Sequence, residues 1–104
     1  MILFISGPMT GYEGYNYDAF FQAEHKLREA GYVVANPARI EGSHEHWTWE
    51  MWMREGLKAL LQCEALAVLP GWLKSEGALM EVSLASGLKM PVEDVEVWLA
   101  ARSQ

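Results

Sequence analysis

The chain has 104 residues, a formal net charge of -6 and a hydrophobic fraction of 51%. A single domain over residues 1–104 is expected, because a chain of this length can bury one real core. No lysine- or arginine-rich run and no stretch of about 20 apolar residues occurs, so we expect neither polymeric nucleic acid nor a membrane as partner. The single cysteine, Cys63, excludes an internal disulfide, which fits a cytoplasmic protein.

The first predicted strand and the first predicted helix flank a glycine-rich loop. Residues 2–6 form a continuous apolar run, which predicts a central strand buried on both faces. The loop over residues 7–14 follows, and Asn16 is expected to cap a helix that runs to about Ala30. Gly31 then takes the position after the helix end where glycine is favoured.

The rest of the chain continues to alternate between strand and helix. Further strands are predicted over residues 32–35 and 65–69, and residues 90–92 are expected to begin a fourth strand. Further helices are predicted over residues 47–62, 76–88 and 95–101. This order predicts an α/β fold, a small doubly wound (flavodoxin- or Rossmann-like) parallel sheet of about four strands with helices on both faces. The loops after the first and third strands should meet where ligands bind in such sheets.

The segment after the third predicted strand carries the main candidate site. Pro70-Gly71 ends the strand, Ser75 begins a helix, and Glu81 follows behind the small residues Gly77 and Ala78. Amide groups at a helix N-terminus bind anions, and a carboxylate one turn further in can face the same crevice. Glu81 is therefore a candidate nucleophile, with a surface glutamate as the alternative. Ser75 is a candidate phosphate contact, with a plain helix cap as the alternative.

The glycine-rich loop after the first strand should form one wall of this pocket. Its sequence, Gly7-Pro8-Met9-Thr10-Gly11, is neither a dinucleotide fingerprint nor a P-loop. Thr10 and Asn16 are possible polar contacts to a ligand, although helix capping is the stronger interpretation of Asn16.

The tryptophan-rich stretch over residues 44–53 has three possible roles. It could be an aromatic lid on a ligand, a subunit contact, or a helix packed on the sheet. His44 and His46 flank Glu45, but no third ligand follows at a recognisable spacing, so we expect no metal and no cofactor. Cys63 is expected to be a buried, inert thiol.

Four motifs together resemble the DUF4406 proteins of phages and bacteria. They are Ile5-Ser6-Gly7-Pro8-Met9-Thr10-Gly11, Tyr15-Asn16-Tyr17, Asn36-Pro37, and Leu69-Pro70-Gly71-Trp72 with Ser75, Gly77, Ala78 and Glu81. That family is similar to the nucleoside 2-deoxyribosyltransferases and the deoxynucleoside 5′-monophosphate N-glycosidases. The resemblance covers about residues 2–92. It implies cleavage or base exchange at the N-glycosidic bond of a 2-deoxyribonucleoside or its 5′-monophosphate, the small molecule expected as partner.

The resemblance also implies residue roles. Glu81 matches the glutamate that attacks the anomeric carbon, and Ser75 matches a serine that holds the 5′-phosphate. The loop from Gly7 to Gly11 matches the loop that lines the sugar pocket. The substrate-binding residues expected from the motifs and the resemblance together are Ser6, Gly7, Pro8, Met9, Gly11, Asn16, Gly71, Ser75, Gly77 and Ala78.

The sequence departs from the enzymes at two positions. Gly56 stands where they carry an aspartate that assists the leaving base, and Phe4 stands where they often carry a tyrosine. Glu55 is a candidate catalytic replacement, although it points about 100° away from position 56 on a helix. Glu50 or a histidine is another.

Two other functions stay open from the sequence. One is a non-catalytic protein that binds a nucleotide or a nucleotide-derived signal. The other is an interaction protein that uses the tryptophan-rich stretch. Because the enzymes usually assemble as dimers or larger, a homo-oligomer is expected.

Overall fold

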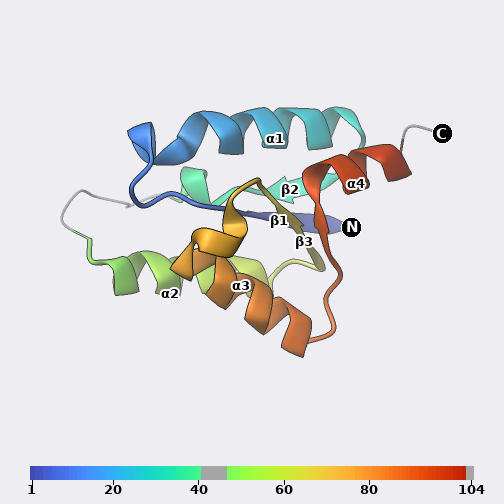
Figure 1. Ribbon diagram of the computed structural model, residues 1–104. Coiled ribbons are helices and arrows are strands. Elements are labelled where there is room, and N and C mark those ends of the chain that lie inside the picture. Colours follow the sequence, from blue (N-terminus) through green and yellow to red (C-terminus); the bar gives the residue numbers. More distant parts are fainter. Residues whose placement is uncertain (41–46, 103–104) are drawn as a thin grey trace.

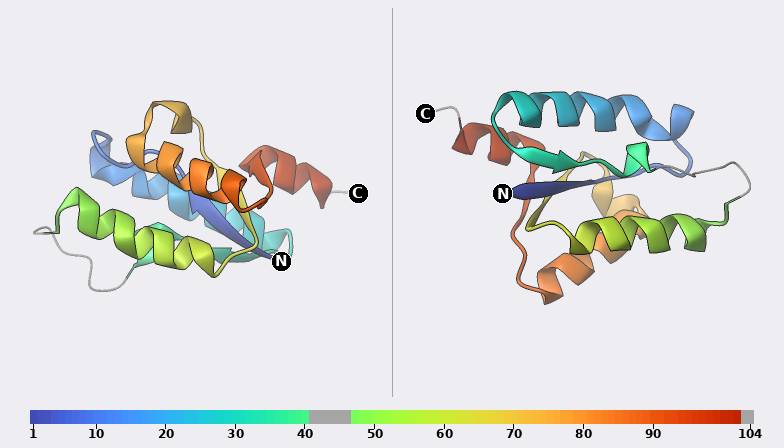
Figure 2. Two further views of the ribbon diagram at one scale, coloured as in Figure 1. Left: turned by 90° about the horizontal axis from the view of Figure 1, so that it is seen from below. Right: turned by 180° about the vertical axis from the view of Figure 1, so that it is seen from behind.

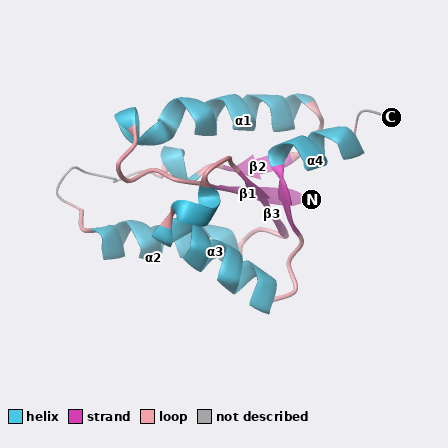
Figure 3. Cartoon of the chain, viewed as in Figure 1, coloured by secondary structure: helices cyan, strands magenta, loops and turns pink. Residues whose placement is uncertain are grey.

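A four-stranded parallel sheet lies at the centre of the molecule, with two helices on each face (Figures 1 and 3). The computed structural model describes residues 1–40 and 47–102. The strands are β1 (Ile2–Ser6), β2 (Val33–Ala35), β3 (Ala65–Val68) and β4 (Val92–Asp94). The α-helices are α1 (Tyr17–Glu29), α2 (Trp49–Leu61), α3 (Glu76–Gly87) and α4 (Val95–Ala101). Short 3-10 helices are η1 (Glu13–Asn16), η2 (Pro37–Arg39) and η3 (Trp72–Lys74). This architecture confirms the predicted fold class.

The strand order is β2-β1-β3-β4, so the order reverses between β1 and β3. In the register, Leu3 pairs with Val34 on one side and with Ala65 on the other. The chain leaves β1 toward one edge of the sheet and later leaves β3 toward the opposite edge. The carboxyl ends of β1 and β3 therefore form the switch point at which doubly wound sheets bind ligands.

The alternating side chains of β1 separate two hydrophobic cores. Leu3 and Ile5 pack with α1 and α4, whereas Phe4 packs with Leu60 of α2 and Ala85 of α3. Figure 2 shows α2 and α3 side by side on their face of the sheet. Ser6 lies two residues beyond Phe4, so strand alternation directs its side chain toward the same α2–α3 layer. A hydroxyl group thus enters this layer among largely apolar side chains.

The end of α1 follows the sequence prediction, and its beginning does not. Gly31 adopts a φ of 97°, and the Tyr32 amide bonds the Leu27 carbonyl at 3.1 Å, as expected for a glycine that ends a helix. Asn16, however, has a left-handed φ of 62° and makes no side-chain cap hydrogen bond. Its side chain Nδ2 donates to the Pro8 carbonyl oxygen at 2.9 Å instead, so the predicted cap is wrong.

Several predicted boundaries shift by one or two residues. The second helix, the third strand and the third helix each end one residue earlier than predicted. Helix α2 begins at Trp49 rather than 47, because Thr48 caps it by accepting a hydrogen bond from the Met51 amide at 3.2 Å. The second strand begins at Val33 rather than 32. The fourth strand, expected to begin with residues 90–92, covers Val92–Asp94. None of these shifts moves a candidate site residue to another element.

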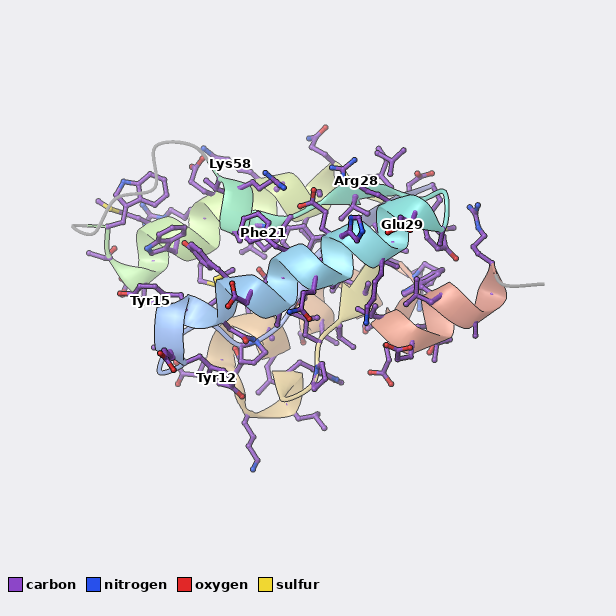
Figure 4. All side chains as sticks on the ribbon, turned by 90° about the horizontal axis from the view of Figure 1, so that it is seen from above. Tyr12, Tyr15, Phe21, Arg28, Glu29 and Lys58 are labelled. Atoms are coloured by element: carbon purple, nitrogen blue, oxygen red, sulfur yellow. The ribbon has the colours of Figure 1, made fainter. Side chains whose placement is uncertain are left out.

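A buried glutamate that the sequence analysis did not single out ties α1 to the turn after β2. Glu24 is 6% exposed and accepts hydrogen bonds from Arg39 at 2.7 Å, Asn36 at 2.9 Å and Arg28 at 2.9 Å. Burial alone would raise the pKa of Glu24, but the bonds from these three partners outweigh it and lower the pKa to about 2. The Arg39 guanidinium also lies over the Phe21 ring, on the side of α1 toward η2 (Figure 4).

Candidate functional site

The loops after β1 and β3 pack directly against each other, as predicted. A Cβ added at Gly7 would lie 2.7 Å from the Leu69 Cβ, so only glycine fits there. Gly71 has a φ of 88°, and a Cβ there would lie 2.8 Å from the Tyr12 hydroxyl oxygen. The Leu69 amide also donates to the Ser6 carbonyl at 2.8 Å. These contacts bring the two candidate loops together at the switch point.

Glu81 points into the molecule beside this junction. The residue is 8% exposed, and its Oε1 accepts a hydrogen bond of 2.6 Å from the Ser6 hydroxyl. Ser6 itself has no exposed surface and is the last residue of β1, immediately before the first glycine loop. The alternative of a surface glutamate is therefore wrong, because the carboxyl group is buried against the end of β1.

Burial changes the ionisation of this carboxyl group. It raises the pKa of Glu81 from 4.5 to about 7, while the hydrogen bond from Ser6 acts in the opposite direction. The neutral form therefore persists to higher pH than in a solvent-exposed glutamate. A perturbed carboxyl group at a sheet switch point is typical of a functional site.

Gly56 of α2 faces Glu81 across the α2–α3 contact. A Cβ at position 56 would lie 3.3 Å from Glu81 Oε2, closer than side chains usually approach. Glu55 is half-buried, and its Oε2 accepts a hydrogen bond of 2.8 Å from Lys58. The structure thus brings Gly56 next to the candidate nucleophile.

The beginning of α3 lies against the beginning of α2. Ser75 caps α3 by accepting a hydrogen bond of 3.2 Å from the Ala78 amide, so the cap prediction is confirmed. A Cβ at Gly77 would lie 3.2 Å from the Met53 sulfur and 4.0 Å from the Trp49 indole nitrogen. The α3 amides that could receive an anion therefore lie beside an aromatic side chain of α2.

The first glycine loop is braced from within. The Asn16 side chain holds the Pro8 carbonyl, and the Tyr12 amide donates to the Met9 carbonyl at 3.1 Å. Pro8 is buried, and Met9 packs against the core on the α1 side. Gly11 has a φ of 86° with open space around it, and Thr10 is exposed. Asn16 thus shapes the loop instead of capping α1.

The tryptophan-rich stretch is described from Trp47 onward, and His44, Glu45 and His46 lie outside the described residues. The rings of Trp47 and Trp52 pack edge to face with centroids 5.2 Å apart. Trp49 and Met51 are 38% and 45% exposed. The helix that begins within this stretch packs on the sheet further along, through Leu60.

Cys63 and the surface hollows lie away from the candidate site. The Cys63 thiol is half-buried rather than buried and donates to the Ala59 carbonyl at 3.3 Å. Burial and the nearby Glu64 charge raise its pKa to about 11, which fits an inert thiol. Two surface hollows lie along η1 and α1, and no predicted site residue lines them. Their lining residues are Glu13, Gly14, Asp18, Phe21, Gln22, His25 and Lys26.

The described ranges contain no group of three His, Cys, Asp or Glu side chains that could hold a metal ion. No helix within those ranges is both long and apolar enough to cross a membrane.

These features define a class: α/β proteins with a buried carboxyl group at the switch point of a parallel sheet. More particularly, the chain belongs to the DUF4406 family, a domain of unknown function, which matches residues 1–94. No curated protein matches the sequence. Among solved structures, the chain is similar to a 2-deoxyribosyltransferase from Bacillus psychrosaccharolyticus, with a TM-score of 0.68 and 17% identity. The match covers 88% of this chain and 69% of that one, and it shows a shared fold.

Proposed function

We propose that this protein cleaves or exchanges the N-glycosidic bond of a 2-deoxyribonucleoside or its 5′-monophosphate, with Glu81 as the nucleophile. The observation that carries the proposal is the burial of Glu81 against Ser6, beside the loop that follows β1. The fold shared with a 2-deoxyribosyltransferase supports the same chemistry.

In the proposed reaction a Glu81 oxygen attacks C1′ of the deoxyribose. The C1′–N bond breaks through an oxocarbenium-like transition state, and its electron pair leaves with the base. Water then attacks C1′, and the electron pair of the ester bond returns to Glu81. Over both steps one water molecule is consumed, so that its hydrogen is on the base and its hydroxyl on the sugar. In a transfer reaction a second base takes the place of water.

The start of α3 is the proposed phosphate site. Ser75 and the amides of Gly77 and Ala78 lie at a helix N-terminus, where backbone N–H groups and the helix dipole favour an anion. Glu81 lies six positions after Ser75, which corresponds to about 9 Å along the helix axis. A phosphate at one end and C1′ at the other would place the sugar along this face of α3.

The test is release of free base from each of the four deoxynucleoside 5′-monophosphates, followed by chromatography. Wild type should release base from at least one, and Glu81→Gln should release none, since the amide cannot act as nucleophile. A second base added to the mixture distinguishes transfer from hydrolysis. The absence of release from all four at high protein concentration would contradict the proposal.

A binding protein without chemistry is the second candidate, because Gly56 places no carboxylate beside Glu81. Such a protein would return its ligand intact after long incubation. Glu81→Gln would then leave the affinity nearly unchanged.

We also propose a homo-oligomer. On α3, Leu79 and Met80 are 42% and 45% exposed, and Trp49 and Met51 of α2 are also exposed. Large apolar side chains of this kind suit a subunit contact. Sedimentation of the purified chain tests this, and a monomer at all concentrations would contradict it.

A further inference from the structure

The hydrogen bond between Ser6 and Glu81 connects two residues 75 positions apart in the chain. Ser6 ends the central strand and has no exposed surface, and Glu81 lies inside α3. A buried hydroxyl in an apolar layer is costly unless it has a partner. Glu81 is that partner, so the serine at this position is tied to the carboxyl group.

The two oxygens of Glu81 have different surroundings. Oε1 accepts the 2.6 Å bond from Ser6. Oε2 is turned to Gly56, where a Cβ would lie 3.3 Å away. The absence of a side chain at position 56 makes room for the Glu81 carboxyl group, which fits closely against the α2 backbone there. The Ser6 bond and this close fit together fix the orientation of the carboxyl group.

We infer that Ser6 is the positioning residue of Glu81: its hydroxyl holds Oε1 and so fixes the orientation in which the carboxyl group meets the anomeric carbon. This inference rests on the proposed function and assigns Ser6 a role through Glu81 rather than in contact with the substrate. Hydrogen bonds to a charged group are stronger than those to a neutral one, so the Ser6 bond favours the ionised, nucleophilic form.

Few groups influence the ionisation of Glu81. Burial raises its pKa, and the Ser6 bond lowers it. From β1 the group that faces Glu81 is the Ser6 hydroxyl, and from α2 it is the backbone of Gly56. The charged neighbours of Gly56 along α2, Glu55 and Lys58, bond to each other. Loss of the Ser6 hydroxyl should therefore act on Glu81 without a competing charge.

The experiment compares wild type with Ser6→Cys and Ser6→Ala, a series in which the donor is first weakened and then removed. Carbon-detected NMR follows the Glu81 carboxyl titration, assigned by its loss in Glu81→Gln. In Ser6→Ala the pKa of Glu81 should rise by about one unit, as expected for the loss of one such bond, with Ser6→Cys in between. Ser86→Ala, at an exposed position near the end of α3, is the control that should leave the titration unchanged.

The second measurement is the pH dependence of base release. The rise of kcat with pH should move upward by about one unit in Ser6→Ala, which lowers kcat near neutral pH about 5-fold. KM should change much less. An unchanged Glu81 titration in Ser6→Ala would refute the inference, whether or not the protein turns over. A wild type that releases no base contradicts the proposed function instead, and the NMR titration still decides whether Ser6 sets the ionisation of Glu81.

Discussion

Gly56 and Glu81 face each other across the contact between α2 and α3, with only 3.3 Å between Oε2 and the position of a Cβ on residue 56. Gly56 lies inside α2, where alanine would stabilise a helix by about 1 kcal/mol. The glycine therefore costs helix stability and makes room for a carboxyl group.

We predict that Gly56→Ala lowers base release while leaving the protein folded. The added methyl group displaces the Glu81 carboxyl by a few tenths of an ångström and strains its bond to Ser6. We expect a loss of about 10-fold or more in kcat, since displaced catalytic groups cost rates of this order. Gly87→Ala is the matched control, because a Cβ there meets nothing within 4 Å. Equal activity in the two variants would contradict the prediction.

The raised pKa of Glu81 predicts a stability that depends on pH. The folded state holds its proton up to about pH 7, whereas the unfolded chain loses it near 4.5. The contribution of protonated Glu81 to the free energy of unfolding is thus complete below pH 4.5. It amounts to about 3 kcal/mol at most and is lost as the pH rises to about 7. Urea unfolding from pH 4.5 to 7.5 should show this decline in wild type and a much flatter curve in Glu81→Gln. Parallel curves would show that Glu81 is not perturbed.

The lowered pKa of Glu24 predicts that the free energy of unfolding depends on pH in the opposite direction, at lower pH. Its pKa is lowered to about 2 in the folded state, so its contribution is present above pH 4.5 and is lost as pH falls toward 2. Glu24→Gln should lower the free energy of unfolding by roughly 1–3 kcal/mol near neutral pH. The difference from wild type should shrink in acid. Glu29→Gln, at an exposed position on the same helix, should have little effect (Figure 4).

The two roles assigned to Ser75, helix capping and phosphate binding, can be tested separately by comparing it with the cap of α2. Ser75→Ala removes a helix cap, which costs about 1 kcal/mol, and it removes the hydroxyl from the proposed phosphate site. Thr48→Ala removes the equivalent cap from α2. Both variants should lose similar stability in thermal unfolding. KM for a deoxynucleoside monophosphate should rise in Ser75→Ala alone, and equal KM values would remove Ser75 from the phosphate site.

Replacement of Gly71 by alanine should destabilise the protein for two reasons, the left-handed backbone conformation and a steric clash. Both Gly71 and Gly11 have a positive φ, but only at Gly71 would a Cβ collide with the Tyr12 hydroxyl. Gly11→Ala should therefore cost about 1–2 kcal/mol for the left-handed conformation alone. Gly71→Ala should cost more, as denaturant unfolding can measure. Similar losses would show that Tyr12 gives way freely.

Local sequence patterns were sufficient for most of the fold. The apolar run of β1, the alternation of strands with helices and the helix end at Gly31 each depend on residues near one another in the chain. The capping prediction for Asn16 is wrong because a tertiary hydrogen bond to the Pro8 carbonyl holds this residue in a left-handed turn. In that conformation its side chain does not cap α1. The sequence pattern that predicts a helix cap gives no information about a tertiary hydrogen bond that competes for the same side chain.

The residues of the candidate site could be proposed from the sequence, but most of their contacts could not. Glu81, Ser75 and the glycine loop are recognisable from motifs, because loops after parallel strands converge at the switch point. The bond from Ser6 to Glu81 and the approach of Gly56 depend on how α2 and α3 cross the sheet. The Glu24 cluster likewise joins residues from α1, the end of β2 and η2. No spacing rule within the chain encodes those distances.

Trapping the covalent intermediate tests the central claim most directly. Wild-type protein is mixed with a deoxynucleoside 5′-monophosphate, quenched in acid within the first turnovers, digested and analysed by mass spectrometry. The account predicts a 2-deoxyribose 5-phosphate ester on the peptide that contains Glu81, absent from Glu81→Gln. Base release at full rate from Glu81→Gln, or an ester on a different residue, would contradict it.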